Sequence, residues 1–378
     1  MNVVMFCHSL RSCWNNGNAH FLRGVVSALV ALGHRVKVYE PVDSWSAHNL
    51  VREEGADMLE AYRTWYPALA NVAYDAQTLD LDEATADAQL VLVHEWNAPE
   101  LVAALGSLRA RRRDFRLLFH DTHHRAATAP DEMAAYDLRD YDGVLAFGSV
   151  IRDLYLERGW TSQAWTWHEA ADAERFRPLL VGGEGGDLVW VGNWGDDERT
   201  DELREFLLDP VWHLQLRAKL FGVRYPSWAL DTLVARGIGF GGWLPNHGVP
   251  EIFSQYRMTV HVPRRPYASQ LPGIPTIRVF EALACGIPLV TGPWEDSEHL
   301  FRVGTDFLMA RNGRQMCELM REVLNDPALG VALAVAGLET VLSRHTCRHR
   351  ALELVELVQK LDASHKLGPP LERSVAQL

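Results

Sequence analysis

The sequence is poor in cysteine, with five in 378 residues. They are widely spaced and form no CxxC pair: Cys7, Cys13, Cys285, Cys317 and Cys347. An odd number without paired spacing argues against a disulfide framework and against a structural zinc site of the CxxC type. The cysteine pattern therefore predicts a protein of the reducing cytoplasm.

Long apolar runs are also missing, although 48% of the residues are hydrophobic. No stretch approaches the ~18 consecutive apolar residues that a membrane-spanning helix needs. The first ten residues, MNVVMFCHSL, place no basic segment ahead of their short apolar stretch, which is unlike a secretory signal. We therefore expect no integral membrane segment and interpret this stretch as a buried first strand.

Basic residues are in the minority, 37 against 49 acidic ones, for a net charge of −12. A chain this acidic is a poor partner for nucleic acid or for an anionic membrane. The exception is a run of arginines within residues 109–116. We interpret it as a solvated helix end that complements the helix dipole, with a patch for an anionic acceptor or a membrane surface as the alternative.

Several motifs of well-known enzyme classes are absent, including GxGxxG, the P-loop, HExxH and GxSxG. Glu40 stands where a dinucleotide-binding fold places its acidic residue, but Gly17 is a single glycine in the preceding turn. These absences argue against nicotinamide-dependent oxidoreductases, P-loop enzymes and nucleophile-elbow hydrolases. An exported sugar-binding protein would need the signal that the first residues lack.

What the sequence does contain is an alternation of strand and helix patterns in two series. The first series has expected strands at 2–8, 35–39, 90–94, 116–120 and 143–147. After a glycine-rich linker at 181–186, the second has expected strands at 187–192, 214–222, 237–240, 258–262 and 287–290. Such alternation predicts parallel sheets with crossover helices. We therefore expect an α/β protein of two Rossmann-like domains facing each other across a cleft, with helices that include 99–111, 149–158, 196–208, 276–285 and most of 313–360.

Polar side chains gather where the predicted strands end, which is the edge at which parallel sheets bind ligands. His94 ends one strand, and Asp121 and His123 follow the next. His20 starts the first helix, and we expect it to face the cleft. A histidine can deprotonate an acceptor near neutral pH, and an aspartate can orient it. These four residues are the candidate catalytic groups, with a purely structural role as the alternative for each.

Two histidine groups, at 120–124 and at 345–349, raise the question of a metal site. Alternate residues of a strand face opposite sides, so the first group cannot converge on one ion. Residues two apart on a helix do not share a face, which argues against the second group. We therefore predict no metal site.

The most specific segment runs from residue 256 to residue 294 and contains PTIRVFEALACGIPLV. It resembles the donor-binding signature of the two-Rossmann-domain (GT-B) glycosyltransferases, within the retaining "group 1" superfamily and nearest to its spore-maturation-protein (CgeB-type) branch. Other segments resemble parts of that superfamily in the same order, namely GNAHFLRGVVSALVALGHRV, VLVHEWNAP, VWVGNW, GFGGWLP and HTCRHRALELVELV. Together the matches cover most of residues 1–360.

The resemblance implies a division of labour along the chain. Residues 1–175 would form the acceptor-side domain, and residues 187–345 the domain that binds the nucleotide-sugar donor. Residues 346–362 would form a helix that returns to the first domain, followed by a loose tail at 363–378. In the superfamily a histidine at the place of His94 approaches the transferred sugar.

Candidate donor-binding residues follow from both the resemblance and local chemistry. Glu281 occupies the place of the superfamily glutamate that holds the nucleotide ribose. Thr276 is a good N-cap, so the helix that follows it would present free N–H groups to a diphosphate. Arginines suit phosphate because their fork donates two hydrogen bonds. The full set is Gly17, Asn18, Arg199, Trp243, Thr276, Arg278 and Glu281, with Arg264 and Arg265 as further phosphate candidates.

The sequence departs from the superfamily at Gly273, where a glutamate that contacts the donor sugar is expected. The sugar therefore stays open, and the acceptor could be a saccharide, a protein or a small molecule. We predict a hexosyltransferase that uses a nucleotide-diphosphate sugar, favouring UDP, without metal or cofactor and with retention favoured over inversion. The alternatives are a sugar-nucleotide epimerase or hydrolase of the same fold, and a non-catalytic nucleotide-sugar-binding homologue.

Overall fold

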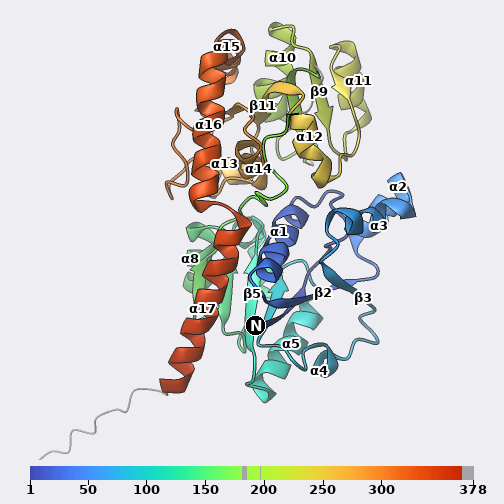
Figure 1. The fold of residues 1–378 in the computed structure, drawn as a ribbon, viewed down its shortest axis with the longest axis vertical. Coiled ribbons are helices and arrows are strands. Elements are labelled where there is room, and N and C mark those ends of the chain that lie inside the picture. Colours follow the sequence, from blue (N-terminus) through green and yellow to red (C-terminus); the bar gives the residue numbers. More distant parts are fainter. Residues whose placement is uncertain (181–184, 196, 368–378) are drawn as a thin grey trace, which may run out of the picture.

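Two α/β domains lie one above the other along the long axis of the molecule, as the computed structural model shows (Figure 1). The structure describes residues 1–180, 185–195 and 197–367. Each domain is built on one parallel sheet, which confirms the predicted fold of two Rossmann-like domains. Most of the predicted glycine-rich linker, residues 181–184, lies outside the described residues.

The first sheet has seven parallel strands in the order β3-β2-β1-β4-β5-β6-β7. The strands are β1 (Asn2–Phe6), β2 (Arg35–Pro41), β3 (Ala70–Tyr74), β4 (Leu90–His94), β5 (Arg116–Asp121), β6 (Gly143–Ala146) and β7 (Ala164–Thr166). The central strands read as continuous apolar runs because helices cover both of their faces. The sequence analysis does not predict β3 and β7, which are edge strands without such a run.

Eight helices of the described chain surround this sheet. They are α1 (Asn18–Ala31), α2 (Trp45–Glu54), α3 (Ala56–Trp65), α4 (Leu81–Ala84), α5 (Pro99–Arg111), α6 (Arg125–Thr128), α7 (Pro130–Ala134) and α8 (Ser149–Glu157). The arginine run at the end of α5 is engaged in ion pairs. Arg109 donates two hydrogen bonds of 2.9 and 3.0 Å to Asp142, and Arg112 pairs with Asp114 at 2.9 Å. This pairing favours the helix-end interpretation of the run.

The second sheet has six parallel strands in the order β10-β9-β8-β11-β12-β13. The strands are β8 (Gly186–Val191), β9 (Ala218–Phe221), β10 (Gly239–Phe240), β11 (Tyr256–His261), β12 (Leu289–Thr291) and β13 (Leu308–Met309). Numbered within its own domain, this is the 3-2-1-4-5-6 order of a doubly wound sheet, and the first six strands of the other sheet follow it too. In both sheets the order in which the chain adds strands reverses between the first and the fourth strand. Such folds bind ligands at this point.

The helices of the second domain differ from the prediction in two places. They are α9 (Thr200–Leu203), the π-helix η1 (Arg204–Leu208), α10 (Asp209–His213), α11 (Ser227–Ala235), the 3₁₀ turn η2 (Asn246–Gly248), α12 (Val249–Phe253), α13 (Arg265–Ser269), α14 (Ile277–Ala284), α15 (Gly313–Asn325) and α16 (Pro327–Arg344). The helix expected at 196–208 instead begins at Thr200 and changes to π geometry, which periodicity alone does not signal. The helical region expected over 313–360 is divided at Asp326, which caps α16, and at His345.

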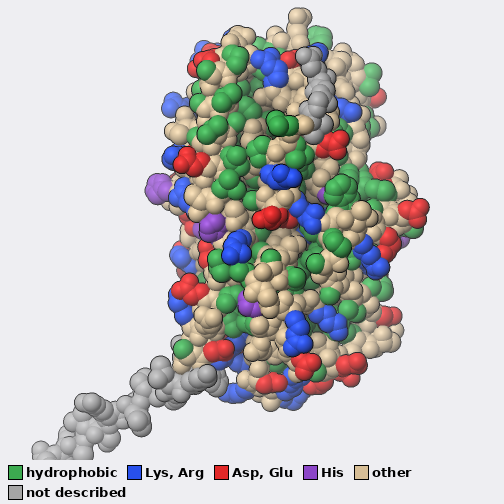
Figure 2. All heavy atoms as spheres, in the orientation of Figure 1, with side chains coloured by type: hydrophobic (Ala, Val, Ile, Leu, Met, Phe, Trp, Pro, Cys, Tyr) green, Lys and Arg blue, Asp and Glu red, His purple; other side chains and the backbone are tan. Residues whose placement is uncertain are grey.

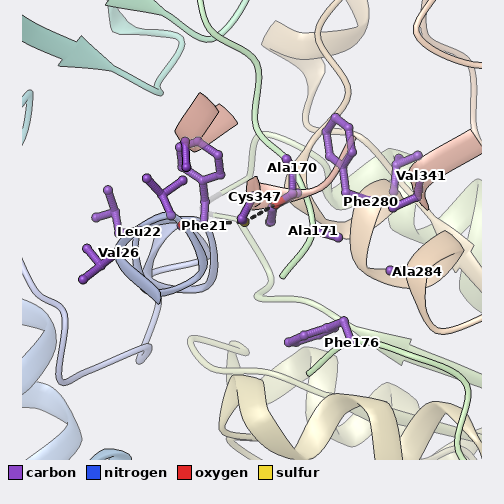
Figure 3. Packing of buried hydrophobic residues seen from close by; sticks show 14 of the residues in the cluster. Phe21, Leu22, Val26, Ala170, Ala171, Phe176, Phe280, Ala284, Val341 and Cys347 are labelled. Atoms are coloured by element: carbon purple, nitrogen blue, oxygen red, sulfur yellow. Dashed lines mark hydrogen bonds between the residues drawn. The ribbon is translucent and has the colours of Figure 1, made fainter. Parts of the chain in front are cut away.

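The last helix, α17 (Cys347–Leu367), leaves the second domain and packs along α1 of the first, as predicted (Figure 1). Cys347 lies against α1 and the 170–171 segment, with its thiol 3.4 Å from the carbonyl oxygen of Ala170 (Figure 3). Gly24 makes this approach possible, since a Cβ there would lie 2.5 Å from the sulfur of Cys347. The predicted end at 362 is wrong, because α17 continues to Leu367; residues 368–378 lie outside the described part.

Within residues 1–180, 185–195 and 197–367, one helix, α16, is long and apolar enough to span a membrane by length and composition alone. It packs on the second domain, where a Cβ on Gly337 would lie 2.6 Å from the side chain of Leu283. On the face drawn in Figure 2, acidic and basic side chains are interspersed over both domains.

Candidate functional site

A cavity of about 630 Å³ lies between the two domains. Its lining from the first domain and the segment after β7 is His8, Asn15, Asn16, Gly17, Asn18, Trp45, Trp96, Thr122, His123 and Glu169. Its lining from the second domain is Gly192, Asn193, Glu198, Arg199, Arg224, Arg264, Tyr267, Thr276, Ile277 and Arg278. Most of these residues follow the carboxyl ends of β1, β4, β5, β8 and β11. The cavity thus joins the ligand-binding edges of both sheets.

A second hollow, of about 650 Å³, lies on the second domain between η1, α10 and α15. None of the predicted site residues lines it. We therefore take the interdomain cavity as the candidate site.

The guanidinium of Arg199 is fixed at the cavity wall by three main-chain carbonyls. Its Nε and Nη1 donate to the carbonyl oxygens of Trp194 and Val262 at 3.3 and 3.0 Å, and Nη2 donates to the carbonyl of Asn193. Burial, together with the neighbouring Arg264 charge, lowers the pKa of Arg199 to about 9. The side chain is still charged near neutral pH, so the fold holds a desolvated cation at the cavity wall, where an anion would be favoured.

The N-terminus of α14 also opens onto the cavity, but Thr276 does not cap it as predicted. Thr276 stands at the N-cap position with no capping hydrogen bond, and its hydroxyl lies 3.0 Å from Nε2 of His261. His261 is in turn 2.9 Å from the hydroxyl of Thr291 on β12. The first N–H groups of α14 are therefore not occupied by the Thr276 side chain and retain their positive partial charge at the cavity.

Arg278 lines the cavity one turn above Glu281, and the two are ion-paired. Glu281 itself has no exposed surface. Its Oε1 accepts a 3.4 Å hydrogen bond from Asn246 and lies 3.3 Å from Nδ1 of His20. Burial raises the pKa of Glu281, and Arg278 opposes that shift. In this structure the buried carboxylate of Glu281 pairs with Arg278 and does not itself line the cavity. The role of Glu281 in binding the ribose stays a prediction.

The expectation that His20 faces the cleft is wrong. The ring is fully buried, stands edge-on to Phe176 at 4.1 Å, and does not line the cavity. Its Nε2 accepts a hydrogen bond of 2.9 Å from the backbone N–H of Asp172, so the ring proton resides on Nδ1. Because the lone pair is engaged and the ring has no exposed surface, His20 is poorly placed to act as a base. In this structure His20 links α1 to Asp172 and Glu281.

His94 does not line the cavity either; it contacts Thr122, which does. It is 3% exposed, and its Nε2 lies 3.0 Å from the hydroxyl of Thr122, which does line the cavity. Burial lowers the pKa of His94 well below its usual range, and the neighbouring histidines and Arg125 add to this. His94 is therefore neutral and can act only through Thr122 unless the site rearranges.

The predicted orientation of His123 by Asp121 does not occur. Asp121 accepts from the backbone N–H of His123 at 2.9 Å and from the hydroxyl of Tyr155 at 2.8 Å, so its carboxylate holds the loop rather than the imidazole. Only His123 reaches the cavity, where it lies edge-on to Trp96 at 5.0 Å. Burial raises the pKa of Asp121 and that of the adjacent Glu95, because it penalises the charged form, and the charge of Asp121 raises the pKa of Glu95 further.

The remaining predicted donor residues divide into two groups. Gly17 and Asn18 line the cavity: a Cβ on Gly17 would lie 3.3 Å from Ile277, and the Asn18 amide donates to Thr122. Trp243 does not line it and packs beside Trp14 instead. The position of Trp243 therefore gives no support to its place among the predicted donor-binding residues. Trp45 and Trp96, 47% and 41% exposed, are the indoles that do face the cavity.

Three charged lining residues were not in the predicted site, namely Glu169, Glu198 and Arg224. Glu169 follows β7 and is 7% exposed. Burial, with the nearby Glu281 charge, raises the pKa of Glu169 to about 8. No periodicity marks such residues, because they are brought to the cavity by chain segments far apart in sequence. Gly273 has a positive φ of 86°, and a Cβ there would lie 2.7 Å from Cγ of Glu298. The missing superfamily glutamate could not be accommodated without rearrangement.

Among the described residues, no group of three or more histidine, cysteine or carboxylate side chains is arranged to hold a metal ion. The cysteines are all free.

Part of the second domain and of α17 is similar in sequence to a known protein family. Residues 199–356 match the family model described as "Glycosyl transferase-like". No curated protein matches the chain in sequence. The match covers the second domain after β8 and about the first half of α17, and therefore includes Arg199, Arg264 and Arg278.

Several solved structures share the fold over nearly the full length. Sucrose-phosphate synthase from Thermosynechococcus elongatus is 14% identical with a TM-score of 0.65, over 96% of this chain and 100% of that one. Anabaena HepE in complex with UDP-glucose is 11% identical with a TM-score of 0.68, over 95% and 100%. An alpha-glucosyltransferase in complex with UDP and a 13-mer DNA is 12% identical with a TM-score of 0.69, over 95% and 98%. At such low identity the likeness shows the fold alone, and that fold is the two-domain GT-B type.

Proposed function

We propose that this protein transfers a sugar from a nucleotide-diphosphate sugar, preferentially a UDP-sugar, to an acceptor. The observation that carries the proposal is the cavity between the domains, whose second-domain wall combines Arg199, Arg264 and Arg278 with the N-terminus of α14. This is the arrangement that a diphosphate requires, since it presents several donors and fixed positive charge. The glycosyl transferase-like match supports it, as do the complexes of HepE with UDP-glucose and of the alpha-glucosyltransferase with UDP.

In this proposal the second domain holds the nucleotide and the first presents the acceptor. The bond between the anomeric carbon and the diphosphate breaks, and its electron pair leaves with the diphosphate, whose charge the arginines and α14 stabilise. The acceptor oxygen forms the new bond and gives up its proton. No metal is required for this stabilisation, and retention of configuration is favoured. We also propose the spore-maturation-protein branch, from the sequence pattern at 256–294.

The acceptor side is rich in flat apolar surface. Trp45 and Trp96 expose nearly half of their surface while lining the cavity, and the amides Asn15 and Asn16 lie in the same wall. An indole face with adjacent amides suits a sugar ring, which has an apolar face and polar edges. Among a saccharide, a protein and a small molecule, this wall favours a saccharide. The free cysteines are consistent with the proposed cytoplasmic location.

Gly273 favours a second candidate, a non-catalytic nucleotide-sugar-binding homologue. The residue that would contact the donor sugar is absent, and its backbone conformation with φ 86° is one that glycine adopts most readily. An epimerase or hydrolase of the same fold would differ by turning over the donor without an acceptor.

A panel of nucleotide sugars in a thermal-shift assay, followed by measurement of nucleotide release, separates these candidates. UDP release from UDP-glucose that requires an added saccharide supports the transferase, and product NMR then reports retention or inversion. Release without acceptor supports the hydrolase, and binding without turnover supports the non-catalytic homologue. Activity should persist in EDTA. Loss on chelation with recovery in manganese would overturn metal independence, and no binding of any nucleotide sugar would overturn the proposal.

A further inference from the structure

Glu169 is a buried carboxyl at the wall of the interdomain cavity, beside the start of α14. It lines the same wall as Thr276, Ile277 and Arg278, and the backbone N–H of Ile277 acts to lower the pKa of its carboxyl. Glu169 thus lies at the helix terminus that the proposed function assigns to the diphosphate.

The charges around Glu169 do not favour a second anion. On α14, Glu281 repels it and Arg278 attracts it, but Arg278 is already ion-paired with Glu281. Tyr267 on α13 and Cys347 on α17 are near enough for the Glu169 charge to raise their pKa values. Burial raises the pKa of both Tyr267 and Cys347, so each stays neutral near physiological pH. One arginine therefore serves two buried carboxyls, and burial with Glu281 raises the pKa of Glu169 to about 8.

A diphosphate entering this wall makes the conflict sharper, because it brings its own negative charge to the same N–H groups. Two anions cannot share one helix terminus without a large electrostatic cost. A neutral carboxylic acid removes that cost, and its O–H can donate to a phosphate oxygen.

We propose that Glu169 binds the nucleotide diphosphate as a protonated acid, so that donor binding takes up a proton at this residue. The inference rests on the proposed function, since it assigns a role to Glu169 within that donor site. Glu169 is then a donor-binding residue that contacts the diphosphate directly and makes donor affinity depend on pH. The affinity is highest where the acid form dominates and falls as pH rises through the pKa of the free protein.

Isothermal titration calorimetry with UDP-glucose tests this, because that probe has no group that titrates between pH 7 and 8.5. Titrations in two buffers of different ionisation enthalpy give the number of protons taken up. With a pKa of about 8 in the free protein, uptake should rise from about 0.1 proton at pH 7 to about 0.75 at pH 8.5, and affinity should fall about fourfold.

Glu169→Gln should abolish both the uptake and the pH dependence, because a carboxamide is neutral throughout this range. Glu174→Gln, on the same segment but exposed, is the matched control and should retain both. If Glu169→Gln fails to fold by circular dichroism, Glu169→Ala makes the same test. Persistent uptake in a folded Glu169 variant, or proton release by the wild type, overturns the inference alone. Failure of UDP-glucose and every other nucleotide sugar to bind at any pH overturns the proposed function, and the inference with it.

Discussion

Replacing Arg199 by methionine is the most direct perturbation of the proposed diphosphate site. A guanidinium has five N–H groups. Within the described chain, three of them donate to the main-chain carbonyls of Trp194, Val262 and Asn193. The two that remain are enough for one forked contact with a phosphate.

The expected magnitude follows from that contact. One hydrogen bond to a charged group contributes about 1.5–3 kcal/mol. Arg199→Met should therefore weaken UDP binding by about tenfold to 150-fold, since ~1.4 kcal/mol corresponds to a factor of ten. Methionine keeps an unbranched stem near the ring of Trp190. Asn193, whose carbonyl oxygen accepts from Arg199, borders the cavity, where water can replace the lost donor. We expect the fold to survive.

The assay is calorimetric titration with UDP, with thermal unfolding as the check on folding. Arg199→Lys should bind with intermediate affinity, because it keeps the charge and loses the fork. Arg265→Met is the matched control: it removes an exposed arginine of α13 that pairs with Glu202 and does not line the cavity. UDP affinity in folded Arg199→Met within about threefold of wild type would refute the diphosphate role, since the loss of even one charged hydrogen bond is larger.

Three further predictions follow from particular contacts. Gly24→Ala should lower the free energy of unfolding in urea by about 1–3 kcal/mol, because its Cβ would lie 2.5 Å from Sγ of Cys347, and adding Cys347→Ala should recover part of the loss. Burial alone would raise the pKa of Glu298, but the hydrogen bond from His168 holds it below 4.5. The stability that the charged carboxylate gives the fold is therefore present above that value and is lost as pH falls through the folded pKa. Glu298→Gln should therefore lower the thermal midpoint more at pH 7 than at pH 4, and an equal loss at both would contradict this. His94→Ala should reduce turnover far more than UDP affinity, because His94 lies on the acceptor side; the opposite pattern would invert the domain assignment.

Elements that are buried on both faces could be predicted from the sequence, because burial there imposes a continuous apolar run. Strands β4 and β5 are of this kind, as is the apolar helix α14. Edge strands such as β3 lie partly in solvent and carry no such constraint. The π-helix η1 depends on how its turn packs, which periodicity does not record.

The candidate site was predictable as a place but not as a set of side chains. The sequence alone determined that histidines and carboxylates follow parallel strands, and parallel strands end at one edge, so the location of the cavity followed. Which side chains reach it was decided by tertiary packing: His20 and Glu281 are turned inward by helix docking, and Asp121 is drawn to Tyr155. Glu169 enters the wall because the segment after β7 passes the start of α14. A side chain's direction depends on neighbours that are remote in sequence, so only the folded chain determines which charges meet.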